Sequence, residues 1–483
     1  MSPRAPSMWN RFLPEKIRYK ITPMSSLKKI FGTDGVRGRA NVEPVTAETA
    51  LKLGRAAAHV FKHLEKKPRG RGRHQIVIGK DTRLSGYMLE NALSSGILSM
   101  GVDVLFIGPL PTPGVAYVTR SLRADAGIVI TASHNPYDDN GIKFFRADGY
   151  KLDDNIEAQI EELVFSGAIE NIRPTAGEIG KAVRIDDALG RYIEFAKASF
   201  SRGSTLEGLR IVVDCAHGAA YKSTPCVLRE LAAEVFVFGN QPDGTNINKE
   251  CGSIHPEHLA RKVREMRADI GIAHDGDADR VILCDEKGTL IDGDDIMAMA
   301  GLDMLAEGTL AQKTLVTTVM SNAGLDVAIK GAGGKVVRTA VGDRSVIDEM
   351  LRNGFNFGGE QSGHLIFSNY GTTGDGLVAA LQILRIMKSR GKPLSEIVKC
   401  WTRYPQLVSN VRVREKKPFE ELDGVLEALA QAEAEVAPTG GRVLLRYSGT
   451  EPKARLLIEG RDAAVLEKWS KKICDTLKQQ VGA

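Results

Sequence analysis

The stretch "QIVIGKDTRLSGYMLENALSSGILSMGVDVLFIG" (residues 75–108) decides the fold class of this chain. It begins and ends with short apolar runs rich in β-branched residues, which predict buried strands over 75–79 and 102–108. Between them, apolar and small residues recur at the i, i+3, i+4 spacing of a helix from Leu89 to Met100. A strand, a helix and a second strand in this order predict an α/β unit with a parallel sheet.

The same alternation recurs along most of the chain. Further strand-like runs occupy residues 126–131, 209–215, 234–239, 269–274, 313–320, 335–341 and 355–359. The tail differs, because an alternating stretch (404–418), a helical pattern (419–436), a strand-like run (441–448) and a last helix predict a smaller α+β domain. We therefore expect three similar α/β domains with mixed or parallel sheets and a C-terminal α+β domain. The expected boundaries give a leader (1–26) and four domains (27–187, 188–290, 291–403 and 404–483).

Composition excludes several classes of protein. The 483 residues carry a formal net charge of +5, but the excess of basic residues lies in the first 30, and the remainder is close to neutral. A nucleic-acid-binding protein would carry a basic face on its folded body, so we expect no nucleic-acid partner. No run approaches the roughly 18 apolar residues of a membrane span, so we expect no membrane partner. The six cysteines lack a C-x-x-C pair and predict reduced thiols in the cytoplasm. We expect the proline-containing leader to be disordered, or an upstream start before Met24.

The stretch "TASHNP" (131–136) places Ser133 in a turn that follows a predicted strand. Pro136 biases Asn135 away from helix, and ligands of open α/β sheets bind beyond the carboxyl ends of strands. His134 is expected to be a poor base for Ser133, because neighbouring side chains of an extended chain point apart. Alone, these residues do not separate a phosphate carrier from an ordinary turn serine.

The stretch "AHDGDADRVILCDEKG" (273–288) places Asp275, Asp277 and Asp279 directly after a strand. Three converging carboxylates repel one another unless a cation compensates them, and all-oxygen ligands suit Mg²⁺. An EF-hand loop would need glycine where Arg280 stands, and "RVILC" predicts a strand instead of a flanking helix. An aspartyl-phosphate phosphatase with Asp275 as its nucleophile is the alternative that these residues leave open.

Two further stretches carry polar groups suited to a sugar phosphate. In "GGEQSGH" (358–364), glycines allow close backbone approach around Glu360, Ser362 and His364. The stretch "LLRYSGTEPKARLLIEG" (444–460) combines two arginines, two hydroxyls and a flexible turn, which together can hold a phosphate. Its candidate ligands are Arg446, Ser448, Gly449, Thr450 and Arg455. With a serine and a cation site, these groups match phosphoryl transfer to a sugar, which needs positioning and charge stabilisation.

With these stretches the chain resembles the α-D-phosphohexomutase superfamily, and within it the glucosamine branch. The matching stretches are "FGTDGVRGRAN" (31–41), "GKDTRLSG" (79–86), "TASHNPYDDNGIKFF" (131–145), "DGDADRV" (275–281), "VGDR" (341–344), "GGEQSGH", "TTGDG" (372–376) and "RYSGTEP" (446–452). They cover nearly everything except the leader.

The resemblance implies four domains around a central cleft and a phosphoserine at Ser133. Mg²⁺ would be held by Asp275, Asp277, Asp279 and a phosphate oxygen on Ser133. The phosphoserine would phosphorylate O1 of glucosamine 6-phosphate, and the bound 1,6-bisphosphate would then return its 6-phosphate and leave glucosamine 1-phosphate. This product would supply UDP-N-acetylglucosamine synthesis.

The resemblance also implies roles for the remaining candidates. His134 and Lys143 would assist as general acid or base, Arg37 and Arg280 would offset charge, Arg344, Glu360, Ser362 and His364 would bind the sugar, and Arg446, Ser448, Gly449, Thr450 and Arg455 would hold the phosphate that is not transferred. A glucose or glucosamine 1,6-bisphosphate is the expected donor of the first phosphate on Ser133. A phosphomannomutase or phosphoglucomutase of the same superfamily is the alternative, and a monomer or homodimer is expected.

Overall fold

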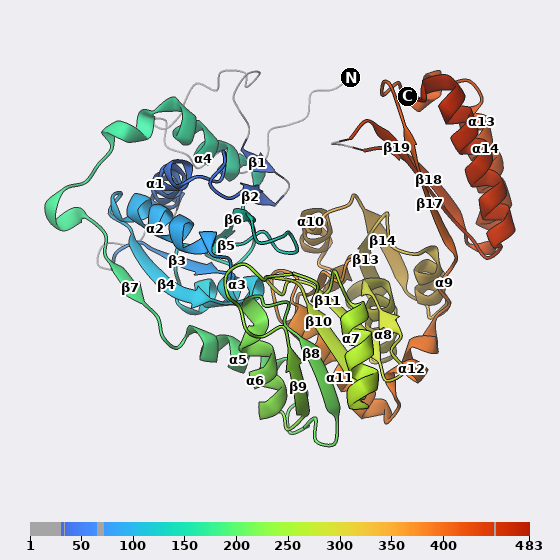
Figure 1. Cartoon of the computed structure of the whole chain (residues 1–483), viewed down its shortest axis with the longest axis horizontal. Helices are drawn as coiled ribbons and strands as arrows, with labels where there is room; N and C mark the ends of the chain where they lie inside the picture. The colour runs from blue at the N-terminus through green and yellow to red at the C-terminus, as the bar shows by residue number, and fades with distance from the viewer. Residues whose placement is uncertain (1–29, 33, 65–71, 449–450) are drawn as a thin grey trace.

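The computed structural model describes residues 30–32, 34–64, 72–448 and 451–483. Within these residues the strands form four sheets, which follow one another along the chain and confirm the predicted fold class. The predicted leader lies outside the described residues. Figure 1 shows the first sheet (blue) and the last (red) on opposite sides of the molecule, with the other two between them.

The first sheet has the strand order β1-β2-β6-β5-β3-β4-β7. Its strands are β1 (Phe31–Gly32), β2 (Gly35–Arg39), β3 (Gln75–Lys80), β4 (Asp103–Pro109), β5 (Ala126–Ile130), β6 (Asp139–Arg146) and β7 (Ala182–Arg184). Strand β3 pairs in parallel with β4 and β5, whereas β6 pairs antiparallel with β5 and β2. Ile76 and Ile78 join the core on one face of β3, and Val77 joins the core on the other. Burial on both faces explains the unbroken apolar run of this strand.

Helices α1 (Ala47–Leu64), α2 (Ser85–Leu98) and α4 (Asp154–Ser166) contribute to the core on one face, and α3 (Thr112–Ser121) contributes to the core on the other. Helices α1 and α2 pack closely because each presents a glycine to the other. A Cβ on Gly54 would lie 2.4 Å from the carbonyl oxygen of Leu93, and one on Gly96 would lie 2.2 Å from that of Leu51. Glycine at both positions therefore allows the two backbones to approach.

The second sheet has the order β12-β11-β10-β8-β9. Its strands are β8 (Arg210–Asp214), β9 (Glu234–Phe238), β10 (Ile270–His274), β11 (Val281–Asp285) and β12 (Leu290–Ile291), and its helices are α6 (Ser223–Glu230) and α7 (Glu257–Met266). Strand β8 pairs in parallel with β9 and β10, and β11 runs antiparallel to β10. Helix α5 (Ala188–Ala198) precedes this sheet and packs against α3 and α6.

The third sheet has the order β14-β13-β15-β16. Its strands are β13 (Thr314–Thr318), β14 (Lys335–Thr339), β15 (Phe357–Gly359) and β16 (Leu365–Phe367), with helices α8 (Gly293–Ala306), α9 (Ala323–Gly331), α10 (Asp343–Asn353), α11 (Gly376–Arg390) and α12 (Leu394–Ile397). Strand β13 pairs in parallel with β14 and β15. The fourth sheet is antiparallel, with the order β17-β19-β18. It comprises β17 (Gln406–Arg412), β18 (Arg442–Tyr447) and β19 (Lys453–Glu459), covered by α13 (Val425–Val436) and α14 (Ala463–Val481).

The predicted helix over 419–436 is shorter in the structure. Helix α13 begins at Val425, because Gly424 adopts a left-handed conformation with φ of 75° and separates it from a short 3₁₀ turn at Phe419–Glu421.

The buried apolar side chains of the fourth domain form a cluster separate from the one that the first three domains share. One continuous cluster of buried side chains includes residues of the first, second and third domains, from Val77 to Trp401. The fourth domain has a separate cluster, from Val411 to Val481. The first three domains therefore share a core, whereas the fourth folds around its own.

Candidate active site

Ser133 lies in the loop between β5 and β6, at the carboxyl end of β5 as predicted. It is buried, and its φ of 52° is left-handed, a conformation that is uncommon for a residue other than glycine. Its backbone N–H donates to Thr131 Oγ1 at 2.9 Å, and its hydroxyl donates to Asp275 Oδ2 at 2.6 Å. The turn thus directs the hydroxyl at the acidic residues of the second domain.

Arg83 and Asn248 hold this loop by its carbonyl oxygens. The buried Arg83 guanidinium donates to the carbonyls of Ser133 at 3.0 Å, Asn135 at 2.8 Å and Asp139 at 3.0 Å, and also to that of Pro136. Asn248, from the second domain, donates to the carbonyls of Ser133 and Asn135 at 2.8 and 3.0 Å. These contacts stabilise the strained turn.

The relation of His134 to Ser133 differs from the expectation that adjacent side chains point apart. Ser133 Oγ lies 3.4 Å from His134 Nδ1, because the left-handed backbone at Ser133 replaces the extended conformation assumed from sequence. The same nitrogen lies 3.1 Å from the guanidinium of Arg280. Burial, followed by the charge of Arg280, lowers the pKa of His134 to about 4. A weakly basic imidazole whose nitrogen faces a guanidinium is poorly suited to a hydrolytic Ser–His pair.

The three aspartates lie between β10 and β11, where Asp275, Asp277 and Asp279 are buried. One carboxylate oxygen from each lies within 4.8 Å of the others. Burial, and then the charges of Asp279 and Asp277, raise the pKa of Asp275 well above its ordinary value. Oδ1 of Asp277 and Oδ1 of Asp279 are buried without a hydrogen-bond partner among the described residues. Free carboxylate oxygens that converge in this way fit a hard cation, and strand β11 after them rules out an EF-hand.

Basic side chains surround the aspartates. Lys143, on β6, is buried with its Nζ 3.0 Å from Asp277 Oδ2, 3.2 Å from Asp34 Oδ2 and 3.5 Å from Asp279 Oδ2. Burial alone would lower the pKa of Lys143, but these carboxylates outweigh it and raise the pKa above its ordinary value. Arg37 pairs with Asp34, and Arg280 Nε lies 3.8 Å from Asp279. The structure therefore brings Ser133, His134, Lys143, Arg280 and the aspartates together, and joins Arg37 to them through Asp34.

The turn between β15 and β16 carries Glu360, Ser362 and His364. Ser362 is exposed, and Glu360 Oε1 accepts a hydrogen bond of 3.0 Å from the backbone N–H of Gly342. His364 is buried, with Nδ1 3.6 Å from Asp279 Oδ2, and its Nε2 accepts from the backbone N–H of Gly374 at 3.1 Å. The turn thus connects the third domain to the aspartate cluster.

Arg344 lies in a contact between the third domain and the first. Its guanidinium is 2.8 Å from Asp154 Oδ1 and 3.3 Å from Glu157 Oε2, and it also donates to the carbonyl of Leu152. These three partners belong to the beginning of α4 and the residues before it in the first domain. The structure therefore places Arg344 at a domain contact, and sugar binding by this residue stays a prediction.

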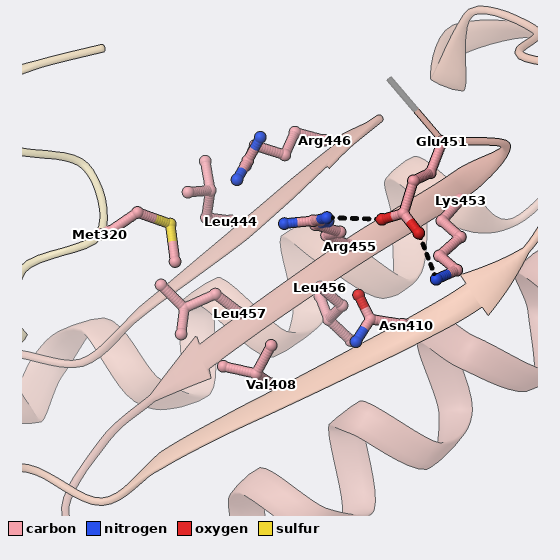
Figure 2. A pocket seen from close by; sticks show the side chains of 10 residues that line it. All are labelled: Met320, Val408, Asn410, Leu444, Arg446, Glu451, Lys453, Arg455, Leu456 and Leu457. Carbon is pink, nitrogen blue, oxygen red and sulfur yellow. Dashed lines mark hydrogen bonds and ion pairs between the residues drawn. The ribbon is translucent and has the colours of Figure 1, made fainter. Parts of the chain in front are cut away.

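Arg446 and Arg455 lie directly opposite each other on β18 and β19. They line a pocket of about 220 Å³ together with Asn410 and Lys453, and Figure 2 shows Met320 of the third domain pointing into it. Like charges opposite each other on a sheet repel, so this arrangement favours an anion. Within the protein Glu451 pairs with Arg455 at 2.8 Å and with Lys453 at 2.6 Å.

Ser448 is buried beside this pocket, and its hydroxyl accepts from the backbone N–H of Glu451 at 3.3 Å. The predictions for Gly449 and Thr450 fall outside the described residues. Sequence reasoning missed Lys453, which lies within the quoted stretch, and also Arg83, Asn248 and Asp34. The stretch "GKDTRLSG" contains Arg83 directly after β3, and that position was the available signal.

Family models match the chain in four segments. They describe phosphoglucomutase/phosphomannomutase alpha/beta/alpha domain I (residues 28–170), domain II (190–288), domain III (292–404) and the C-terminal domain (409–476). Similar solved structures include a phosphoglucomutase/phosphomannomutase family protein from Burkholderia thailandensis, with a TM-score of 0.75 and 24% identity, covering 94% of this chain and 99% of that one. Another is Aspergillus fumigatus N-acetylphosphoglucosamine mutase in complex with GlcNAc-6P and magnesium, with a TM-score of 0.58 and 17% identity, covering 89% of this chain and 99% of that one. The fold and the site together define a four-domain sugar-phosphate mutase, an isomerase.

Curated relatives are similar over almost the whole length. The phosphoglucosamine mutase of Geotalea daltonii is 56% identical over 94% of this chain and 99% of that protein. The phosphoglucosamine mutase of Syntrophotalea carbinolica is 58% identical over 94% of this chain and 98% of that protein. The chain belongs to the phosphoglucosamine mutases, within the phosphoglucomutase/phosphomannomutase family. Among the described residues, no helix is long and apolar enough to cross a membrane.

Proposed function

We propose that this enzyme interconverts glucosamine 6-phosphate and glucosamine 1-phosphate through a phosphoserine at Ser133. The observation that carries the proposal is the 2.6 Å hydrogen bond from the Ser133 hydroxyl to Asp275, because it places a single nucleophilic oxygen at the three aspartates. The membership of the chain in the phosphoglucosamine mutases supports this activity over an aspartyl-phosphate phosphatase.

The reaction consists of two phosphoryl transfers. First, O1 of glucosamine 6-phosphate attacks the phosphorus on Ser133; the O1–P bond forms, the P–Oγ bond breaks, and the O1 proton passes to a base. The resulting 1,6-bisphosphate then reorients in the site, so that its 6-phosphate faces Ser133. Ser133 Oγ next attacks the 6-phosphate, and the sugar O6 leaves with a proton, so that glucosamine 1-phosphate is released and the phosphoserine is restored.

Asp275, Asp277 and Asp279 would hold Mg²⁺ with a phosphate oxygen on Ser133. When bound, the cation would neutralise charge on the transferring phosphoryl group. The Oδ1 atoms of Asp277 and Asp279, which have no hydrogen-bond partner in the described part of the chain, support this role, because a buried carboxylate oxygen otherwise needs a donor.

Lys143, Arg37 and Arg280 would offset the charge of the phosphoryl group. Lys143 is held by three carboxylates, which suits a permanent cation better than a proton acceptor. His134 lies 3.4 Å from Ser133 Oγ and would contact the transferring group as a neutral imidazole, because burial and the charge of Arg280 lower its pKa to about 4.

The substrate would be held at both ends. Glu360 and Ser362, with His364 behind them, would contact the sugar hydroxyls. Arg446 and Arg455 would bind the phosphate that is not being transferred, and Ser448, Gly449 and Thr450 would be further ligands of it. Because arginine binds phosphate through paired donors, the same two residues suit either phosphate of the bisphosphate.

Labelling tests the phosphoserine. Enzyme incubated with glucose or glucosamine 1,6-bisphosphate and Mg²⁺ should acquire one acid-stable phosphate, which peptide mass spectrometry should locate on Ser133. Ser133→Ala should not acquire this phosphate, and its kcat should fall more than about a thousandfold, because the covalent intermediate cannot form. The exposed Ser201→Ala is the control. A hydroxylamine-labile phosphate on Asp275 would instead support the phosphatase.

Comparison of kcat/KM for glucosamine, glucose and mannose phosphates tests the substrate. Glucosamine phosphate should give the highest value, and a higher kcat/KM for mannose or glucose phosphate would support a phosphomannomutase or phosphoglucomutase.

The proposal extends to a cytoplasmic monomer or homodimer whose product supplies UDP-N-acetylglucosamine synthesis. Its four domains would be bounded near residues 187, 290 and 403.

A further inference from the structure

The segment that follows β6 in the first domain contacts the third domain at several points. The carbonyl oxygen of Gly149 accepts a hydrogen bond of 2.6 Å from Thr372 Oγ1. Lys151 Nζ lies 2.5 Å from Asp34 Oδ1 and also pairs with Asp343 Oδ2. Tyr150 packs against a cluster of buried side chains of the third domain, which includes Val346. These contacts join two domains that are separated in sequence by the whole of the second.

On the third domain, the contact centres on three consecutive residues, Gly342, Asp343 and Arg344. The backbone N–H of Gly342 donates to Glu360 Oε1 at 3.0 Å. Asp343 pairs with Lys151, and Arg344 pairs with Asp154 and Glu157 at 2.8 and 3.3 Å. Asp343 and Arg344 are the first two residues of α10, and Gly342 directly precedes them. The start of α10 (Gly342–Arg344) therefore holds the candidate sugar-binding carboxylate with its first residue and the first domain with the next two.

We propose that Lys151 is a positioning residue, which fixes the start of α10 (Gly342–Arg344) on the first domain and thereby sets the position of Glu360 relative to Ser133. The inference rests on the proposed function, because it assigns Glu360 to the sugar.

The electrostatics of Lys151 favour a fixed arrangement. Only 13% of its side chain is exposed, and the side chains of its partners Asp34 and Asp343 are 18% and 17% exposed. Without this ammonium, Asp34 would keep Arg37 and Lys143 as cationic partners. Asp343 would keep, among the described residues, only the imidazole of His364, at 3.6 Å. Lys151 therefore compensates Asp343 above all, and removing it would leave a mostly buried carboxylate at the domain contact without its lysine.

Arg344 strengthens the same contact independently of Asp34. Its partners lie at the beginning of α4, whereas Asp34 belongs to the group that also contacts Lys143. Variants on the Arg344 side therefore test how the start of α10 is held on the first domain without altering the surroundings of Lys143.

The principal test measures kcat and KM of Lys151→Met for glucosamine 6-phosphate in the full-length enzyme with Mg²⁺. Displacement of the start of α10 should raise KM about tenfold and leave kcat within about threefold, since binding of substrate and transition state is weakened alike. Lys151→Arg should recover most of the affinity, because it restores the positive charge. Lys52→Met, at an exposed lysine of α1, is the control.

A second variant keeps the test valid if Lys151→Met does not fold. Glu157→Gln removes a single charge from the Arg344 contact and should raise KM in the same direction by about threefold. The content of phosphate on Ser133, measured by intact-mass spectrometry, should equal that of the unaltered enzyme in both variants, because the start of α10 has no hydrogen bond or ion pair with Ser133 among the described residues.

The outcomes separate the two proposals. An unaltered enzyme without phosphate on Ser133 or without mutase activity would contradict the proposed function. An active, phosphorylated enzyme in which Lys151→Met and Glu157→Gln leave KM unchanged would contradict only the positioning role of Lys151. A fall in kcat at constant KM in Lys151→Met would also contradict it and would point to the Asp34–Lys143 contact instead.

Discussion

At the scale of single residues, burial also perturbs a carboxyl group outside the candidate site. Asp294 is buried in the first turn of α8. Its Oδ2 accepts from the backbone N–H of Asn322 at 2.9 Å, and its Oδ1 has no hydrogen-bond partner within the described ranges. Burial, followed by the charge of Asp292, raises the pKa of Asp294 to about 7.

This pKa predicts a pH dependence of stability. A carboxyl group with a pKa near 3.8 when unfolded and about 7 when folded binds its proton more tightly in the folded state. Its ionisation therefore destabilises the fold as the pH rises between these values, and the penalty is complete above about 7. Asp294→Asn removes the ionisation. As the pH rises from 4 to 8, we expect the free energy of unfolding of this variant to increase by about 2–4 kcal/mol relative to that of the unaltered protein.

Denaturation midpoints in urea at pH 4.5 and pH 8 measure this difference. Exposed Asp423→Asn should show no such change between the two pH values and is the control. A difference between Asp294→Asn and the unaltered protein that stays constant with pH would contradict the assignment.

At the scale of secondary-structure elements, the periodicity of the sequence was sufficient to place most strands. The run 75–79 predicted β3, and the run 102–108 predicted β4, because both are apolar on two faces. Periodicity was insufficient for the contact between helices, since it does not show which small residues face each other. Gly54 and Gly96 fall within helical patterns, but only the packing of α1 on α2 explains them.

The packing of these helices gives a second prediction. In Gly96→Ala the new Cβ would lie 2.2 Å from the carbonyl oxygen of Leu51, on the backbone of α1, which cannot rotate away. The helices must separate, and we expect a loss of about 2 kcal/mol or more. Gly331→Ala, in α9, is the matched control, because a Cβ at that position would meet no other described residue within 4 Å outside its own helix turn.

The control should be neutral or stabilising by up to about 1 kcal/mol, as expected for replacing an unhindered helical glycine. Thermal unfolding of both variants provides the measurement. Equal stability of Gly96→Ala and Gly331→Ala would show that α1 and α2 do not pack as closely as described.

At the scale of the whole molecule, the proposed reaction requires two domains that are far apart in sequence to act on one substrate. Ser133 lies in the first domain, and the arginine pair lies in the fourth, which Figure 1 shows apart from the first. The first three domains share a core and the fourth has its own, so the aspartate cluster and the arginine pair belong to separately packed parts of the molecule.

This division predicts that the two ends of the site can be separated by mutation. Arg455→Met should raise KM for glucosamine 6-phosphate about a hundredfold, because a charged contact to phosphate is lost. It should leave the phosphate on Ser133 intact, since Ser133 and its partners belong to the first and second domains. Lys471→Met, at an exposed position of α14, is the control. Loss of the phosphoserine in Arg455→Met would contradict the division of roles.

The sequence by itself determined the fold class, the four-domain order and the residue types of the site, because strand and helix periods and dense motifs are local properties of the chain. It placed Asp275, Asp277 and Asp279 together, since they lie on one turn after one strand. Only the tertiary structure decided which distant groups meet. The hydrogen bond from Ser133 to Asp275 spans 142 residues, and no local pattern encodes the left-handed turn or the Arg83 contacts that direct it. The same holds for Lys151 and Arg344, whose partners across the domain contact are fixed by the packing of whole sheets. Side-chain convergence of this kind depends on how buried surfaces fit together, which the order of residues along one segment does not specify.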